Sequence, residues 1–139
     1  MRHPKPIDEE FKFTGRVIIS ETDLKGVITF ANRKFCEITG YSVDELIGKP
    51  HNIIRHPDMP RVAFATMWET IQSGNTWRGL VKNLRKDGLY YWVETEISPV
   101  RNDLHETVGY IAARKPASRA NIDEATEKYK KLIEREGNL

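Results

Sequence analysis

Five short stretches of the chain are rich in β-branched and aromatic residues and end at turn-forming residues, which predicts five β-strands. They are Val17–Asp23, Val27–Ala31, Trp77–Arg85, Leu89–Ile97 and Val108–Ala113. Gly26 lies between the first two stretches, and Lys86-Asp87-Gly88 lies between the third and fourth, so each pair is expected to form a hairpin. A loop from Pro99 to His105 is expected before the last strand.

Helical patterns separate these strands. A short helix is expected over 32–40, and the capping box formed by Ser42 and Glu45 predicts a second over 42–48. The longest helix before the tail is predicted over 60–74, where apolar residues recur at helical spacing. These residues are Phe64, Met67, Trp68 and Ile71. The order of the elements predicts an α+β fold, with the helices on one face of a five-stranded antiparallel sheet.

The two ends of the chain are expected to flank one domain formed by residues 16–115. Residues 1–15 are interpreted as a polar lead whose Phe11 and Phe13 dock on the domain. Residues 116–139 are expected to form a C-terminal helix that acts as a linker or in dimerisation. Its apolar residues recur at spacings of three and four, which fits either a short coiled coil or an amphipathic helix packed on its own domain. They are Ile122, Ala125, Tyr129 and Leu132.

The stretch from His51 to Pro60, HNIIRHPDMP, concentrates imidazole, guanidinium and carboxylate groups. Its prolines hold the backbone rigid while the polar side chains project from it. Rigid loops with converging polar groups are typical of binding sites. The alternative is a solvated connection in which Asp58 caps the following helix and Arg55 pairs with a surface acid.

A second polar feature lies within the predicted sheet. Period-two alternation puts Trp77, Gly79, Val81 and Asn83 on one face, and this face is expected to point inward because it carries no charge. A buried asparagine without hydrogen-bond partners costs about 1–3 kcal/mol, so Asn83 must bond to backbone or to a ligand. Gly79 is expected to leave room for a flat ligand beside the aromatic wall of Trp77, which suits a planar heteroaromatic ring.

Composition narrows the classes of function. The chain has 139 residues, of which 39% are hydrophobic and 30% charged, as expected for one soluble globular domain with short extensions. Its basic residues are dispersed and the net charge is +2, so nucleic acid is a poor partner. One cysteine, Cys36, fits a reducing compartment. The charged N-terminus is unlike a secretory signal, and no stretch approaches the roughly 20 apolar residues of a membrane span. We expect a cytoplasmic protein without direct membrane insertion, although a receptor partner could associate it with a membrane.

A set of segments spread over residues 17–114 carries a family resemblance. They are Ala31-Asn32, Ile38-Thr39-Gly40-Tyr41, Gly48-Lys49-Pro50-His51-Asn52, Arg55-His56-Pro57-Asp58-Met59-Pro60, Phe64, Met67-Trp68, Trp77, Gly79, Val81-Lys82-Asn83 and Tyr91-Trp92-Val93. The set resembles PAS domains, and within them the flavin-binding PAS domains of aerotaxis (Aer) and energy-taxis (CetB) receptors. The run from Arg55 to Pro60 is the specific part, because general PAS domains lack it.

The resemblance implies a sensor domain that binds FAD noncovalently and reports the redox state of the flavin to a signalling partner. The FAD-binding residues it implies are Asn32, Arg55, His56, Asp58, Phe64, Trp77 and Asn83. The implied partners are a HAMP or methyl-accepting chemoreceptor domain, in the same chain or another, and a second PAS copy. No nucleophile–base pair or open metal site is evident, so an enzyme is not expected.

The chemistry of these residues is consistent with the implied cofactor. Arg55 and His56 offer donors for a pyrophosphate, and Asn83 matches the donors and acceptors at the edge of a flavin ring on which Trp77 packs. Asp58 would repel a phosphate, so it is expected to orient Arg55 or His56 or to accept a hydrogen bond from ribose. Electron transfer would change the hydrogen bonding of Asn83, and the change would pass along its strand to the outer sheet face or the chain ends.

Four alternatives stay open at this point. A haem sensor would use His51 or His56 as axial ligand, whereas His51 is otherwise expected to be structural. A metal site of His51, His56 and Asp58 lacks a clear fourth ligand. Light-driven covalent chemistry is disfavoured because Cys36 lies on an early helix. The remaining alternative is a ligand-free PAS domain used for dimerisation or partner docking.

Overall fold

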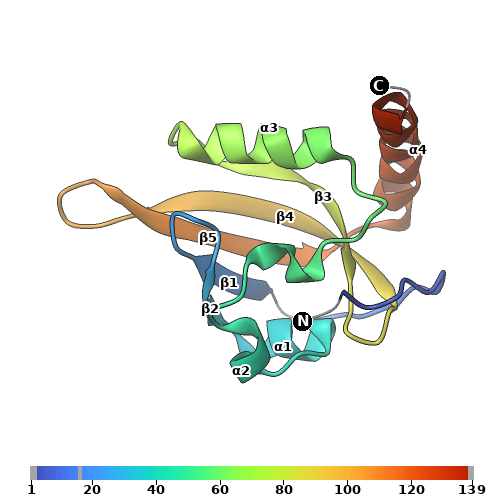
Figure 1. The fold of residues 1–139 in the computed structure, drawn as a ribbon, viewed down its shortest axis with the longest axis horizontal. Coiled ribbons are helices and arrows are strands. Elements are labelled where there is room, and N and C mark those ends of the chain that lie inside the picture. Colours follow the sequence, from blue (N-terminus) through green and yellow to red (C-terminus); the bar gives the residue numbers. More distant parts are fainter. Residues whose placement is uncertain (1–2, 16, 138–139) are drawn as a thin grey trace.

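Five strands form one antiparallel sheet in the computed structural model, which describes residues 3–15 and 17–137. The strands are β1 (Ile18–Thr22), β2 (Ile28–Ala31), β3 (Trp77–Leu84), β4 (Tyr90–Arg101) and β5 (Thr107–Pro116). Their order across the sheet is β2-β1-β5-β4-β3 (Figure 1). The pairing of β1 with β5 therefore joins the hairpin of β1 and β2 to the three strands β3, β4 and β5. The predicted five-stranded α+β fold is confirmed.

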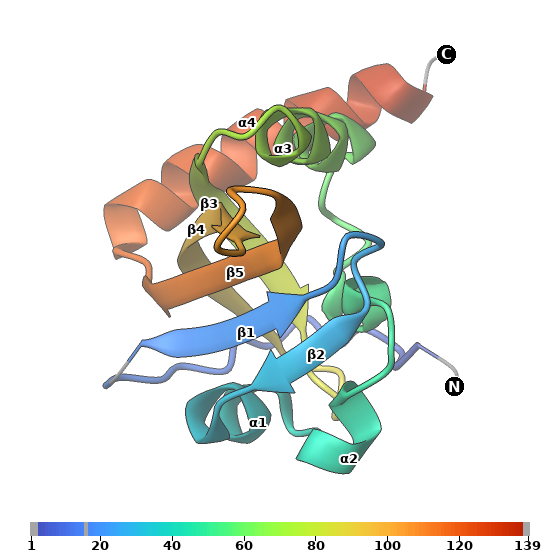
Figure 2. The same cartoon turned by 90° about the vertical axis from the view of Figure 1, so that its left-hand side faces the viewer.

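Helices α1 (Arg33–Thr39) and α2 (Val43–Leu46), the 3₁₀ helix η1 (His51–Ile54) and helix α3 (Arg61–Gln72) connect β2 to β3 (Figure 2). The Asn32 side chain caps α1 by accepting the Phe35 N–H, and Ser42 and Glu45 form the predicted capping box of α2. Caps of this kind are specified by adjacent residues, which explains why both helices begin where the sequence predicts.

The core lies between the sheet and these helices. Phe35, Ile28, Leu46 and Val93 are fully buried there, and Tyr91 is 1% exposed. Burial of apolar surface on this scale contributes about 25 cal/mol per Å². The helical connection is therefore held by its apolar side chains, although three of its four helices have seven residues or fewer.

Two elements differ from the sequence prediction. Residues 51–54 of the proline-framed stretch form the turn of η1 instead of extended loop. The predicted loop from Pro99 to His105 is shorter than expected and covers residues 102–106, because β4 continues to Arg101 and pairs with β5 through Pro99 and Tyr110. Proline is tolerated at this point because β3 pairs with β4 only as far as Ile97, so no ladder bond on that side is lost.

The N-terminal lead docks on the domain as expected. The Phe11 N–H donates to the Tyr90 carbonyl at 2.7 Å, and Phe13 meets the ring of Tyr91 edge-on. The Arg85 guanidinium lies 3.8 Å from the centre of the Phe11 ring. These contacts fasten residues 10–13 beside the start of β4.

The C-terminal helix α4 (Arg119–Gly137) packs on its own domain, the second of the two predicted arrangements. It covers the outer face of the sheet, where Tyr129 stacks on Trp92 with ring centres 6.1 Å apart. The Tyr129 hydroxyl donates to the Leu80 carbonyl of β3 at 2.6 Å. Ile122 and Ala125 are buried in the same contact.

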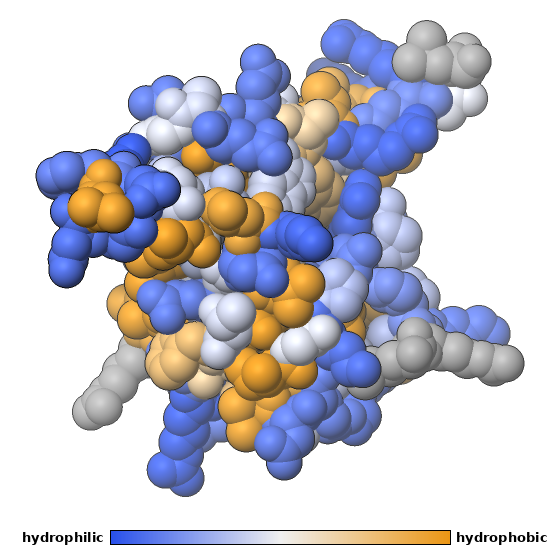
Figure 3. Space-filling model, turned by 60° about the vertical axis from the view of Figure 1, so that its left-hand side comes forward, coloured by the Kyte–Doolittle hydropathy of each residue, from blue (hydrophilic) through white to orange (hydrophobic). Residues whose placement is uncertain are grey.

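Apolar side chains appear between charged ones on the face shown in Figure 3. The large apolar residues exposed at the surface of the described chain include Leu24, Phe30, Leu104 and Val108. None of the described helices is both long and apolar enough to cross a membrane.

Candidate functional site

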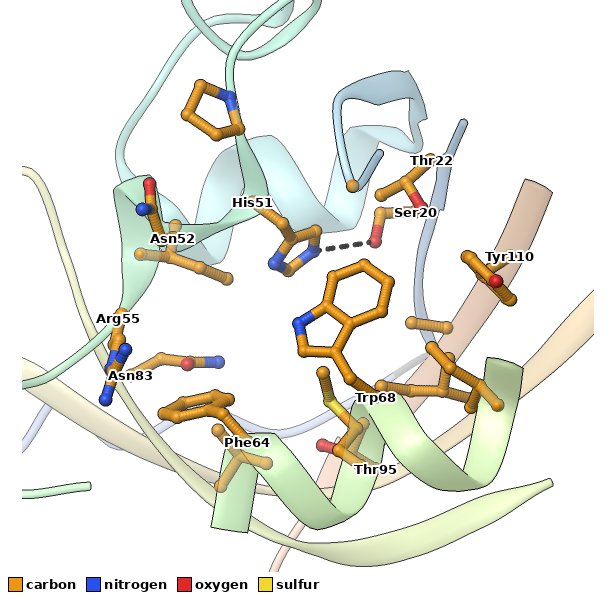
Figure 4. Close-up of a pocket in the computed structure, with 18 of the residues that line it drawn as sticks. Ser20, Thr22, His51, Asn52, Arg55, Phe64, Trp68, Asn83, Thr95 and Tyr110 are labelled. Atoms are coloured by element: carbon orange, nitrogen blue, oxygen red, sulfur yellow. Dashed lines mark hydrogen bonds between the residues drawn. The ribbon is translucent and has the colours of Figure 1, made fainter. Parts of the chain in front are cut away.

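A cavity of about 280 Å³ lies between the inner face of the sheet and the elements η1 and α3 (Figure 4). The sheet contributes residues of β1, β3, β4 and β5, and the helical side contributes residues of η1 and α3. The lining residues that carry the argument below are Ser20, His51, Arg55, Phe64, Trp68, Asn83, Thr95 and Arg114.

Arg114 places a buried positive charge in the sheet wall. Its side chain belongs to β5 and is 4% exposed. One guanidinium nitrogen donates to the Ser20 hydroxyl at 3.1 Å and another lies 2.8 Å from Nε2 of His51. Both partners are neutral, and the guanidinium also lies 5.0 Å from the centre of the Phe35 ring. A buried charge without an opposite charge is costly, so Arg114 is a strong candidate to face an anionic or acceptor group of a ligand.

His51 is held in its neutral form by this arrangement. Nε2 accepts from Arg114, so the ring proton must reside on Nδ1. Burial, together with the positive charge of Arg114, lowers the pKa of His51 to about 3. Burial also lowers the pKa of Arg114 to about 10, which still leaves the guanidinium charged at neutral pH.

Two further polar side chains of the sheet enter the cavity wall. Asn83 of β3 is 3% exposed, which confirms that it points inward. The Thr95 hydroxyl of β4 is buried and has no hydrogen-bond partner among the described residues. A buried hydroxyl left in this state costs about 1–3 kcal/mol, so a ligand that bonds to Thr95 would recover that cost.

The opposite wall is aromatic and apolar. Phe64, Met67, Trp68 and Ile71 of α3 all line the cavity. The Trp68 indole projects across it (Figure 4), and its ring lies 3.0 Å from the point that a Cβ on Gly26 would occupy. It also meets Tyr110 edge-on with ring centres 5.8 Å apart. Trp68 therefore spans from α3 to the turn between β1 and β2.

Arg55 lies at the end of η1 and lines the same cavity. Its guanidinium lies 4.3 Å from the centre of the Phe64 ring. The backbone of Arg55 also forms a bridge with that of Asn83, so the proline-framed stretch is joined directly to β3. Stacking on a ring face leaves the donors around the edge of the guanidinium plane able to bond to a ligand.

The structure brings three of the seven predicted site residues together at the cavity: Arg55, Phe64 and Asn83. Asn32 is occupied as the cap of α1, and its amide donates to the Val17 carbonyl. Trp77 lies outside the cavity lining. The predicted room beside Gly79 was wrong, because the Trp77 indole fills it and lies 2.6 Å from the position of a Cβ on Gly79.

His56 and Asp58 also lie outside the cavity lining, and they form a cluster with Lys82. Nδ1 of His56 accepts the Asp58 N–H at 3.0 Å, and the Asp58 carboxylate pairs with Lys82 Nζ at 2.8 Å. Burial, followed by the Lys82 charge, lowers the pKa of His56 to about 4. Burial acts to raise the pKa of Asp58, but the Lys82 hydrogen bond and charge outweigh it and hold that pKa below its ordinary value. Asp58 thus contacts His56, one of its two expected partners; it pairs with Lys82 rather than Arg55 and does not cap α3.

Sequence reasoning missed Arg114, Ser20, Trp68 and Thr95 and assigned His51 a structural role. Tyr110, Ala112 and Arg114 alternate along one face of β5, but the predicted strand ended one residue before Arg114. The helical face of Trp68 was recognised and interpreted as core. Extending the period-two pattern to Arg114 would have found the buried cation.

The PAS fold family profile matches residues 28–114. The chain belongs to the PAS family. This PAS domain is 44% identical over 115 residues to the aerotaxis receptor of Escherichia coli (strain K12), a match that covers 83% of the chain and 22% of the receptor. It is 36% identical over 102 residues to the nitrogen fixation regulatory protein of Klebsiella pneumoniae, covering 73% of the chain and 21% of that protein. The chain thus spans about a fifth of the length of these relatives and is a PAS domain of the aerotaxis-receptor type.

Solved structures show the same fold. The light-state Aureochrome1 LOV photoreceptor superposes with a TM-score of 0.68 at 24% identity, covering 88% of this PAS domain and 91% of that chain. A PAS domain from Colwellia psychrerythraea gives a TM-score of 0.67 at 25% identity, covering 74% and 87%.

Proposed function

We propose that this PAS domain binds FAD noncovalently and reports the redox state of the flavin to a chemotaxis-type signalling partner. The observation that carries the proposal is the polar set in the sheet wall, in which Arg114, Asn83 and Thr95 lie opposite the apolar and aromatic side chains of α3. Ligand pockets commonly have this composition, with apolar walls and a few converging polar groups.

The lining residues fit a flavin ring. Phe64 and Trp68 offer apolar and aromatic surface to the faces of a planar ring, while Asn83 can both donate and accept at its edge. The Thr95 hydroxyl is free to bond, and Arg114 would stabilise negative charge on the ligand. A bound flavin supplies reversible electron transfer.

Arg55 and the stretch around it favour FAD over a smaller flavin. Its fork suits a pyrophosphate, and its place at the end of η1 puts the fork beside Phe64 in the cavity wall. Asn32, His56, Asp58 and Trp77, which the resemblance also implies, lie outside the cavity lining, so we propose for them only weak contacts with the parts of FAD outside the cavity.

The signalling role is proposed from the relatives. One is named an aerotaxis receptor and another a nitrogen fixation regulatory protein, and this PAS domain aligns with about a fifth of each. By that relation we propose a cytoplasmic sensor whose partner is a chemoreceptor signalling domain, in the same chain or another.

The two histidines make haem a weaker alternative. His51 Nε2 already accepts from Arg114, so binding iron through this atom would leave the buried guanidinium with one neutral partner fewer. His56 lies outside the cavity lining, and its Nδ1 accepts the Asp58 N–H.

An absorption spectrum of the purified protein, recorded before and after dithionite, tests the function. The expected result is a flavin spectrum that bleaches on reduction, with FAD as the nucleotide released by denaturation. A Soret band would mean haem. A colourless protein that takes up no added FAD would contradict the proposal and favour a ligand-free docking domain.

Asn83→Ala tests the proposed route of the signal through β3. Asn83 lies three residues from Leu80, whose carbonyl accepts from Tyr129 of α4. Loss of one buried hydrogen bond should weaken FAD binding about tenfold and abolish the redox-dependent change in exposure of α4. Flavin fluorescence and limited proteolysis of both redox states measure these effects. The control is Asn75→Ala, an exposed asparagine beyond α3. If Asn83→Ala retained both FAD affinity and the redox-dependent change, this route would be wrong.

A further inference from the structure

Helix α3 begins without a cap from its own neighbourhood. The first N–H groups of a helix have no partner within the helix and need an outside acceptor. Pro60 occupies the capping position of α3 and offers no side-chain acceptor, and Asp58 does not take that role. The acceptor must come from another part of the chain.

Glu136, near the end of α4, supplies this acceptor. One carboxylate oxygen accepts the Arg61 N–H and the other accepts the Val62 N–H, both at 3.0 Å. The Arg61 guanidinium adds a contact at 3.5 Å. These backbone hydrogen bonds hold the pKa of Glu136 below its ordinary value, so the carboxylate is charged at neutral pH.

This contact fastens the far end of α4. The middle of the helix is fixed by Tyr129, which stacks on Trp92 and donates to the Leu80 carbonyl. Glu136 lies seven residues further on, where α4 passes beside the first turn of α3 (Figure 1). Its side chain is 19% exposed, whereas that of Arg61 is 74% exposed. The carboxylate is thus partly covered where the two helices meet.

The other side of α3 forms the helical wall of the cavity. Phe64 and Trp68 follow the capped turn directly, and the Trp68 indole reaches across to Gly26. A ring placed in the cavity would have to share this space with Trp68. Any shift of α3 that accommodates the ring would move the N–H groups that Glu136 accepts.

We propose that Glu136 is a latch between α3 and α4, so that the helical wall of the cavity and the C-terminal end of α4 are held closed together and open together. Glu136 lies outside the cavity lining, so it acts by positioning α3 and not by contact with a ligand. The consequence for signalling rests on the proposed function: entry of FAD displaces Trp68 and α3 and releases the last turns of α4.

Amide hydrogen exchange on the flavin-free protein tests the latch itself. Glu136→Ala is compared with Glu134→Ala, which removes an exposed carboxylate from the same turn. Loss of the cap should speed exchange about fivefold, both in residues 61–72 and in residues 130–137, whereas Glu134→Ala should change neither. If only residues 130–137 exchanged faster, Glu136 would be a local contact and the proposed coupling would be overturned.

The same exchange measurement on FAD-loaded protein tests the link to the ligand. Loading should raise exchange of residues 130–137 in the unsubstituted protein toward the level of Glu136→Ala, and it should add little in that variant. Protein that binds FAD without this rise would contradict release by the ligand. Failure to take up FAD would contradict the proposed function, while the flavin-free comparison would still decide whether the latch exists.

Discussion

Residues 51–55 and residues 56–60 carry similar side chains but face different surroundings. The first half turns into the cavity, where His51 meets Arg114 and Arg55 stacks on Phe64. The second half turns away from it, where His56 and Asp58 meet each other and Lys82. Each half thus contains a histidine with a lowered pKa and a nearby cation, yet only the first contributes to the wall of the cavity.

The difference shows why a perturbed histidine is not by itself a sign of a ligand site. The cation of the first half, Arg114, has neutral partners, whereas Lys82 in the second half is paired with a carboxylate. A cation paired with a carboxylate needs no further counter-charge, whereas a buried cation with neutral acceptors alone gains from an anionic group of a ligand. Charge compensation, more than pKa, distinguishes the half that lines the cavity from the half that does not.

The largest expected effect on flavin affinity comes from removing the Arg114 cation, and removal of Lys82 is its matched control. Arg114→Met should weaken flavin binding about 100-fold, equivalent to about 3 kcal/mol, because a charge-assisted contact in a buried site is lost. Lys82→Met should change it less than about threefold, since Lys82 lies outside the cavity lining. Fluorescence titration with FAD measures both. The Arg114 variant should still fold, because Ser20 remains within 3.2 Å of His51 Nε2. Equal losses of FAD affinity in the two variants would contradict the proposed difference between residues 51–55 and residues 56–60.

The free energy of unfolding should decrease as the pH is lowered, because His56 is buried in its neutral form. Its pKa is about 4 when folded, against 6.5 for the ordinary residue, so the unfolded chain binds more protons between these values. This contribution to the free energy of unfolding is therefore complete above pH 6.5 and declines as the pH falls to about 4, by about 3 kcal/mol.

Urea unfolding of His56→Asn at pH 7 and pH 4.5 measures that contribution. Asparagine can accept the Asp58 N–H but does not titrate, so the variant should lose less stability on acidification than the unsubstituted protein. His51→Asn should retain the part due to His56. An unchanged pH dependence in His56→Asn would show that this ring is not the group responsible.

Local patterns predicted the strands, the position of α1, the capping box of α2, and the inward side chain of Asn83, since each depends on alternation or on residues within one or two turns. The side-chain contacts in and around the cavity were harder to predict from the sequence. Trp77 fills the space over Gly79 through its choice of rotamer, which alternation does not specify. His51 depends on Arg114, 63 positions later in the chain.

The cap of α3 shows the same limit. Asp58 was the natural candidate by proximity, but Glu136 holds that position from 75 residues beyond Arg61. Contacts of this range are set by how the sheet brings α3 and α4 together, and no spacing in the sequence encodes them. The resemblance to flavin-binding PAS domains named Arg55, Phe64 and Asn83, which do line the cavity, because a family motif reflects contacts that only the fold creates.

The smallest expected effect is that of Asp58→Asn. The Asp58 side chain is 64% exposed, and exposed ion pairs contribute about 0.5 kcal/mol that salt screens. We expect a loss of that size in the free energy of unfolding, less in high salt, and less than about a threefold change in FAD affinity. Lys82→Asn should give a larger loss, because the Lys82 side chain is 14% exposed and its Nζ also lies 4.3 Å from the centre of the Tyr90 ring. A tenfold loss of FAD affinity in Asp58→Asn alone would show that the second half of the stretch reaches a part of the cofactor beyond the cavity, which is the role that the resemblance implies for this carboxylate.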